Sequence, residues 1–224
     1  WVGRMYCHDS FCPNTSPHPF YTSTYRAWLL DSVFEASGYL ASCGTMGIML
    51  GYNQGFVIGG SHFINMPHSG LCGDEGGIDF EAGGDNAVIR GCTFRNNAGA
   101  AIEVLGLRSP QSRNNHFVGC RFDRDNHAHV LGPAEIYIWG GSRDRTVVCS
   151  NGLVEDNGYV LLPGVSFFTN VSKLVEADWT LRNNREFSSF DDLDRAMPLN
   201  NPPDVSAGDE IWTDDPEVTL TGRV

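Results

Sequence analysis

Two acidic residues occupy equivalent positions in two similar segments of the sequence. Asp79 lies in Ile78-Asp79-Phe80 and Glu103 lies in Ile102-Glu103-Val104, so each carboxylate follows an isoleucine in an alternating apolar pattern. If both segments are strands of one parallel sheet, the two carboxylates are neighbours about 4.8 Å apart on its outer face. Glycosidases use two carboxylates at a comparable separation, one as the acid and one as the base or nucleophile. Asp79 and Glu103 are therefore the candidate catalytic pair of a glycoside hydrolase.

Side chains suited to bind a sugar accompany this pair. When the segments are aligned by their isoleucines, Tyr137 falls at the position of Asp79, while Glu81 and Trp139 fall at the next outward position. Aromatic rings offer a flat apolar surface to a sugar ring. Three histidines precede these strands and can donate hydrogen bonds or transfer a proton: His68, His127 and His129. We expect these six residues to bind substrate; the alternative is a solvated acidic face with structural histidines.

The carboxylates also suggest a metal site. Asp74, Glu75 and Asp85 flank the segment of Asp79 and add oxygens of the kind that Ca²⁺ prefers. A Ca²⁺ ion held by these residues is the one cofactor that the sequence suggests.

A repeat of about thirty residues positions these segments. Its first column is the apolar residue shared by DSVFEAS, GSHFINM, GCTFRNN, GCRFDRD, NGLVEDN and DWTLRNN, namely Phe34, Phe63, Phe94, Phe122, Val154 and Leu181. Small residues precede most of these positions, and Asn or Asp follows most of them. Alternate residues of a strand point the same way, so the pattern predicts stacked strands with an inward apolar column and turns at the Asn positions.

A second alternating column follows the first in the repeat. It runs through residues 47–50, 77–81, 101–104, 135–138 and 165–168. A period of two indicates strands, whereas an α-solenoid would show apolar spacings of three and four. The sequence therefore predicts an all-β fold, a parallel β-helix of about six coils.

The segments GGIDFEAGGDNAVIRGCTFRNNAGAAIEV and NNHFVGCRFDRDN resemble right-handed parallel β-helix repeat proteins, and the resemblance covers roughly Asp31 to Asn184. It implies a right-handed solenoid and a carbohydrate-active function, because this group includes many secreted polysaccharide lyases, glycoside hydrolases and epimerases. Its lyases use a Lys or Arg base, often beside Ca²⁺, on an acidic polysaccharide. Lys173 is the single lysine, and the first-column arginines lie away from Asp79, so a hydrolase ranks above a Ca²⁺-dependent lyase. These arginines are Arg90, Arg95, Arg121 and Arg124.

The chain is expected to have three parts. Residues 1–30 form an irregular N-terminal segment, residues 31–187 the β-helix, and residues 188–224 a linker with the start of another module. In this tail, Asn201-Pro202-Pro203 and the later Pro216-Glu217-Val218 resemble the opening of a PKD-like or immunoglobulin-like module. Because the sequence begins at Trp1 without a signal peptide, we expect a piece of a longer precursor.

Composition limits the partners and the location. The formal net charge is −12 and the pI is about 4.8, so neither nucleic acid nor an anionic membrane is an expected partner. An acidic, lysine-poor chain is typical of secreted proteins, and we expect an extracellular location. In that environment Cys7 and Cys12 would form a small disulfide loop.

A non-catalytic extracellular solenoid, used for adhesion or assembly, is the competing function. Its acidic groove would be only a solvated face. Uncapped coils expose strand edges that pair readily with other strands. The expected partner is therefore a polysaccharide for the enzyme, and copies of the chain or the rest of a longer precursor for the structural protein.

Overall fold

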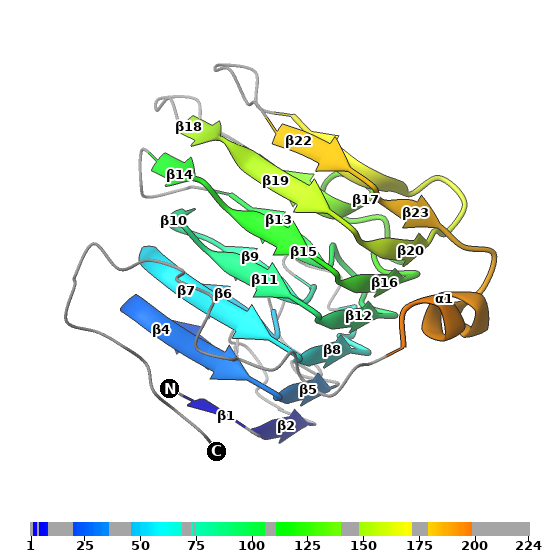
Figure 1. Ribbon diagram of the computed structural model, residues 1–224, viewed down its shortest axis with the longest axis horizontal. Coiled ribbons are helices and arrows are strands. Elements are labelled where there is room, and N and C mark those ends of the chain that lie inside the picture. The colour runs from blue at the N-terminus through cyan, green and yellow to red at the C-terminus, as the bar shows by residue number, and fades with distance from the viewer. Residues whose placement is uncertain are drawn as a thin grey trace.

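Parallel strands stacked in three sheets make up the protein (Figure 1). The computed structural model describes residues 2–3, 5–8, 20–35, 46–68, 73, 75–105, 111–139, 148–171 and 179–198. Within these residues every strand pair is parallel, and each coil of the chain adds a strand to the growing sheets. The fold is the all-β parallel solenoid that the sequence predicts.

Sheets A and B form two long sides of the solenoid. Over the described residues, sheet A has the order β1 (Val2–Gly3), β4 (Tyr25–Leu30), β7 (Asn53–Gly59), β11 (Val88–Arg90), β15 (His116–Val118), β19 (Gly152–Glu155) and β22 (Trp179–Arg182), and β10 (Gly84–Asp85) also pairs with β7. Sheet B has the order β2 (Tyr6–His8), β5 (Val33–Glu35), β8 (His62–Ile64), β12 (Thr93–Arg95), β16 (Arg121–Asp123), β20 (Gly158–Val160) and β23 (Arg185–Glu186).

Sheet C forms the third side. Its order is β3 (Phe20–Thr22), β6 (Ile48–Leu50), β9 (Ile78–Phe80), β13 (Ile102–Val104), β17 (Ala134–Ile138) and β21 (Ser166–Asn170). A small separate sheet pairs β14 (Gln111–Arg113) with β18 (Val148–Ser150). The short helix α1 (Phe190–Ala196) lies beside sheet B (Figure 1). No helix in the described part of the chain is long and apolar enough to cross a membrane.

The solenoid extends into the segment predicted to be irregular. Cys7 of β2 pairs in register with Phe34, and Leu29 of β4 pairs with Ile58. Both supply apolar side chains to the core, which is why these residues join the stack. The number of coils therefore differs slightly from the six that the sequence predicts.

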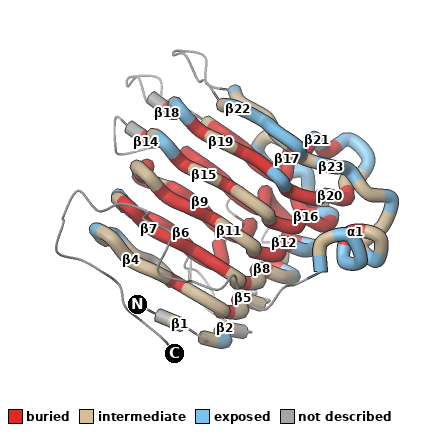
Figure 2. Tube along the Cα trace, in the orientation of Figure 1, coloured by how far each residue is buried: buried red, intermediate tan, exposed pale blue. Residues whose placement is uncertain are grey.

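Three inward columns build the core. In sheet B, the rings of Phe34, Phe63, Phe94 and Phe122 stack with 5.1 Å between successive centroids. Sheet C contributes a column of isoleucines that ends at Phe168, and sheet A contributes a third column of aliphatic and aromatic residues. Figure 2 shows the consequence, because buried residues run through the middle of the stack and make up most of β7, β9, β16 and β17.

The phenylalanine column does not continue as predicted. Tyr159, not Val154, follows Phe122 in sheet B, and Val154 and Leu181 belong to sheet A beside Phe117. The prediction was wrong because strands of both sheets carry the same local pattern, an inward apolar residue followed by a turn. NGLVEDN matches that pattern but forms β19 of sheet A.

A left-handed residue turns the chain from six strands of sheet A, β4, β7, β11, β15, β19 and β22, towards sheet B. These residues are Asp31 (φ 50°), Gly60 (φ 59°), Gly91 (φ 57°), Gly119 (φ 61°), Asp156 (φ 54°) and Asn183 (φ 53°). Gly, Asn and Asp tolerate this conformation best. The first five donate their amides to the next coil, as in Gly60 N to Arg90 O at 3.1 Å, so the turns stack in the same way as the strands.

Candidate functional site

The predicted catalytic pair lies in sheet C. Asp79 of β9 and Glu103 of β13 are neighbours in the register and Tyr137 follows them, as the sequence predicts, while Met49 precedes them. However, both carboxylates are 0% exposed, and Met49 and Tyr137 are each 8% exposed. Burial, with the charge of Glu103 adding to it, raises the pKa of Tyr137. The pair is thus adjacent but not in an open groove, and its catalytic role stays a prediction.

The predicted aromatic surface is part of an apolar cluster. Tyr137 is buried against Ala100 and Leu105, and Trp139 packs onto the same cluster. Their rings therefore stabilise the outer side of sheet C instead of standing free for a sugar. Glu81, in the turn after β9, is only partly buried.

The three predicted histidines lie between sheets B and C. Nδ1 of His68 is 2.6 Å from Oε2 of the fully buried Glu75. His127 and His129 are exposed in the turn before β17. Partial desolvation of the His127 ring, with a contribution from the charge of the nearby His68, lowers the pKa of His127.

The predicted Ca²⁺ ligands are not gathered into one site. Glu75 is paired with His68, whereas Asp85 lies in β10 of sheet A and accepts a hydrogen bond from Arg113 N at 2.8 Å. Asp74 lies outside the described residues. Among the described residues, no three His, Cys, Asp or Glu side chains are grouped so that they could hold a metal ion. Ca²⁺ binding stays a prediction.

The predicted disulfide loop is contradicted by the position of Cys7. Cys7 is a free thiol that packs against the core in register with Phe34. Burial raises the pKa of this thiol. Its inward direction follows from the strand alternation of β2, which the sequence analysis did not recognise. Cys12 lies outside the described residues.

The structure has a cleft on the outer side of sheet B, where β8, β12 and β16 meet helix α1. Its volume is about 710 Å³. The charged and titratable residues that line it are His62, Arg95, Arg121, Arg124, His127 and Asp194. Three guanidinium groups against one lining carboxylate make this cleft basic, although the chain as a whole carries a charge of −12.

A buried carboxylate holds two of these arginines. Asp123 is 0% exposed, and its oxygens lie 3.0 Å from Nε of Arg95 and 2.8 Å from Nε of Arg124. Both arginine side chains are nearly half exposed. The carboxylate therefore fixes two guanidinium groups at the cleft, and each keeps terminal N–H groups near solvent.

The third arginine is held from both sides. Nε and Nη2 of Arg121 donate to Oγ1 of Thr93 at 3.1 and 2.6 Å. Its Nη1 donates to Oδ1 of Asp194 at 2.6 Å and to the carbonyl of Met197 at 3.4 Å. Thr93 thus positions the guanidinium from the sheet, and α1 covers it, leaving the side chain 4% exposed.

One titratable base stands in the same outward column. His62 and Arg121 flank Thr93 in the register of sheet B, so their backbones lie about 10 Å apart. Burial lowers the pKa of His62, the charge of Arg121 lowers it further, and Asp31 opposes these effects. His62 is accordingly a neutral imidazole at pH 7.

The sequence contained a signal for this cleft that the repeat analysis did not use. Asn65, Asn96 and Arg124 occupy successive left-handed positions after strands of sheet B, with φ of 58°, 55° and 57°. Arginine is less suited than asparagine to this conformation. A residue that departs from the local preference of its own column is a reasonable candidate for a functional role.

A pair of buried acids lies directly behind the cleft. Asp125 and Glu135 are 0% exposed, and Glu135 Oε1 accepts a hydrogen bond from the amide of Asp125 at 3.2 Å. Burial raises the pKa of Asp125 to about 7, and burial together with the charge of Asp125 raises that of Glu135 well above its usual range. Oδ1 of Asp125 also accepts from the side chain of Asn97 at 2.7 Å. The pair holds a proton near neutral pH and anchors the turn that carries Arg124.

The three parallel sheets and their stacked turns define a β-solenoid, and the family comparison agrees. The model of the right-handed β-helix region matches residues 20–158, which is more than half of the chain. The chain therefore belongs to the right-handed β-helix family.

A search of solved structures found the A-module of a mannuronan C-5 epimerase from Azotobacter vinelandii. It is 12% identical, with a TM-score of 0.38, and the match covers 82% of this chain and 54% of that module. The chain thus spans about half the length of the module. This similarity is too low to support an inference about the reaction. No curated protein is significantly similar in sequence to this chain.

Proposed function

We propose that this protein acts on an acidic polysaccharide in the sheet-B cleft. The observation that carries the proposal is the pair Arg95 and Arg124, which the buried Asp123 holds at the cleft with part of each guanidinium exposed. Arginine binds carboxylates through two parallel N–H···O bonds, which is suited to the carboxylate of a uronic acid unit. Successive strands are about 4.8 Å apart, so a polymer lying across β8, β12 and β16 meets a new set of side chains at regular steps.

The chemistry that this cleft supports best is removal of the proton next to a bound carboxylate. Arginines that neutralise the carboxylate stabilise the carbanion that forms there. Neutral His62 then takes the proton as the general base. The electron pair expels the neighbouring glycosidic oxygen, which takes a proton from solvent, and an unsaturated sugar remains at the new chain end. Reprotonation from the opposite face, without cleavage, is the epimerase version of the same step.

This proposal reverses the order suggested by the sequence, which ranked a hydrolase above a lyase. Three of the arginines that lie away from Asp79, namely Arg95, Arg121 and Arg124, line a cleft, whereas Asp79 and Glu103 are fully buried. Hydrolysis through this acid pair remains the second candidate, because the register stacks the two carboxylates at a suitable separation.

Replacing the arginines tests the proposal. Arg95→Gln and Arg124→Gln should each weaken binding of oligogalacturonate roughly ten-fold, because each removes a charge-assisted hydrogen bond. His62→Gln should retain binding and lose the unsaturated product or the epimerised sugar. The working form of His62 is neutral and its pKa is lowered. The kcat/KM of the wild type should therefore fall only at pH values below the ordinary pKa of histidine. Calorimetry and product analysis by NMR measure these effects.

Two sets of variants make the test decisive. Arg26→Gln removes an equal charge from sheet A and should leave binding unchanged. The amide variants Asp79→Asn and Glu103→Gln address the second candidate. The hydrolase is correct, and the cleft proposal is wrong, if two results are found together. The amide variants must no longer form products with saturated sugar ends, while the arginine variants bind and convert substrate normally.

A further inference from the structure

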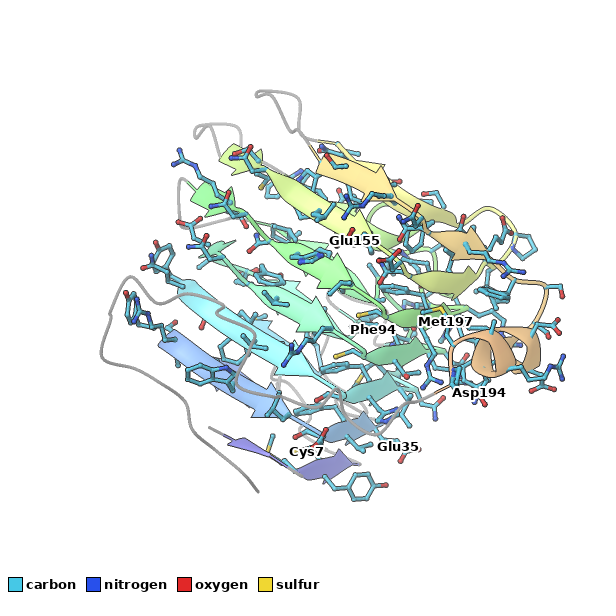
Figure 3. The ribbon with its side chains drawn as sticks, in the orientation of Figure 1. Cys7, Glu35, Phe94, Glu155, Asp194 and Met197 are labelled. Carbon is cyan, nitrogen blue, oxygen red and sulfur yellow. The ribbon has the colours of Figure 1, made fainter. Side chains whose placement is uncertain are left out.

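Helix α1 contacts the cleft through groups that a ligand would also use. Asp194 places a carboxylate on Nη1 of Arg121, and the ring of Phe190 lies 4.3 Å from the guanidinium carbon of Arg95. Figure 3 shows Asp194 and Met197 between the helix and sheet B. The carboxylate–arginine contact of Asp194 is the same contact that a uronate would make. In the described structure, α1 therefore occupies part of the basic surface.

The attachment of α1 to the solenoid is small. Its buried residue is Leu193, whose Cδ1 fits into the space left by the missing side chain of Gly158; a Cβ on Gly158 would lie 2.2 Å from it. The ion pair with Arg121 is half exposed on the Asp194 side, so it adds only modest stability. Seven residues are too few for a helix to be stable in isolation. If these contacts are lost, α1 should detach from the solenoid and unfold at the same time.

The sheet side of the subsite does not depend on the helix. Thr93 holds two nitrogens of Arg121 from the neighbouring strand, and Asp123 holds Arg95 from β16. If α1 leaves, the arginines keep their positions and Nη1 of Arg121 becomes available. The arrangement is therefore that of a formed anion subsite under a weakly attached cover.

We infer that α1 is an internal competitor of the ligand, with the Asp194 carboxylate occupying the Arg121 subsite until an acidic polysaccharide displaces it. This inference rests on the proposed function, since it concerns regulation of the same cleft. A site that is accessible only in a fraction of molecules binds with an affinity reduced by that fraction. Weakening α1 without changing the arginines should consequently tighten binding.

Binding of oligogalacturonate to the whole chain and to three variants, measured by calorimetry, tests the inference. Asp194→Asn removes the competing carboxylate, and Leu193→Ala removes the apolar anchor. We expect each to bind roughly three- to ten-fold more tightly than the wild type. Asp191→Asn is the matched control, because it removes an equal charge from an exposed position of α1 and should leave the affinity unchanged. Fully methyl-esterified oligogalacturonate should not bind more tightly to any variant.

A second measurement reports on the helix itself. The amides of Leu193 and Met197 donate within α1 and its cap at 3.1 and 2.8 Å, so their hydrogen exchange reports whether the helix is formed. Ligand should accelerate this exchange in the wild type, and Leu193→Ala should accelerate it without ligand. Thermal unfolding confirms that each variant retains the solenoid.

The results separate the inference from the proposed function. If the wild type binds, but Asp194→Asn and Leu193→Ala bind equally or less tightly and ligand slows exchange in α1, the helix is a fixed wall of the site; the inference fails and the proposed function stands. If no protein binds, including Leu193→Ala with a rapidly exchanging α1, the proposed function and the inference fail together.

Discussion

Buried carboxylates around the cleft are accommodated in two different ways. Asp123 forms ion pairs with both Arg95 and Arg124. Asp125 and Glu135 lie next to each other instead, and burial raises the pKa of both, so the pair holds a proton near neutral pH.

The pair Asp125 and Glu135 should make the folded state less stable as the pH rises. The pKa of Asp125 is about 7 in the folded protein and roughly 3.9 in an unfolded chain, so between these values only the folded state holds the proton. Its stabilising contribution is complete below about pH 4 and is lost as the pH rises through 7. In urea titrations from pH 5 to 7, the wild type should lose roughly 1 kcal/mol per pH unit relative to Asp125→Asn, which removes the titrating carboxyl group.

The control for this titration is Glu186→Gln, at an exposed position of β23. Its stability should follow the wild type in parallel over the whole range. Parallel curves for Asp125→Asn as well would show that this carboxyl group does not hold a proton near neutral pH.

At the scale of elements, the stack of phenylalanines links sheet B across coils. Phe94 lies between Phe63 and Phe122, with interplanar angles of 10° on both sides. The strands are only three residues long, so each contributes few backbone hydrogen bonds. The aromatic stack therefore supplies much of the apolar contact between neighbouring coils, and the same coils carry the cleft on their outer side.

Removal of one ring should destabilise the whole solenoid. Phe94→Ala deletes a fully buried side chain, for which the expected loss is about 4 kcal/mol of unfolding free energy. For a chain of this size the midpoint of thermal unfolding should fall by roughly 10 °C, measured by calorimetry. Leu181→Ala, at a position that is 47% exposed, should change it little. A shift for Phe94→Ala as small as that of the control would show that the stack relaxes around the cavity.

At the scale of the molecule, the solenoid is a one-dimensional array in which each coil contacts its neighbours. Its last described coil is the most exposed part of the stack, as the colouring of β22 and β23 shows (Figure 2). Trp179 attaches this coil, because its ring packs 5.5 Å from Phe117 and its Nε1 donates to Cys149 O at 3.2 Å. A terminal coil with so few buried side chains can open without unfolding the centre.

Trp179→Ala should therefore produce local opening. Hydrogen exchange should increase in β22 and β23, while the amides of β12 keep their protection. Phe94→Ala is the comparison, because a change in the central stack should increase exchange in both regions. Equal loss of protection throughout the solenoid of Trp179→Ala would mean that the coils unfold as one cooperative unit.

The sequence by itself determined the solenoid and much of its register. Alternation within short strands and repetition between coils are local properties, and they correctly aligned Phe34 with Phe122 and Asp79 with Glu103. The same local pattern could not tell a strand of sheet A from one of sheet B, which is why Val154 was misplaced.

Only the tertiary structure decided which outward residues are accessible. Alternation gives the direction of a side chain relative to its own strand, whereas exposure depends on every segment that packs over that face. Asp79 and Glu103 point outward and are nevertheless buried, while Arg95 and Arg124 stay partly open at the cleft. Asp194 reaches Arg121 across 73 residues of sequence, and no repeat of about thirty residues encodes that contact.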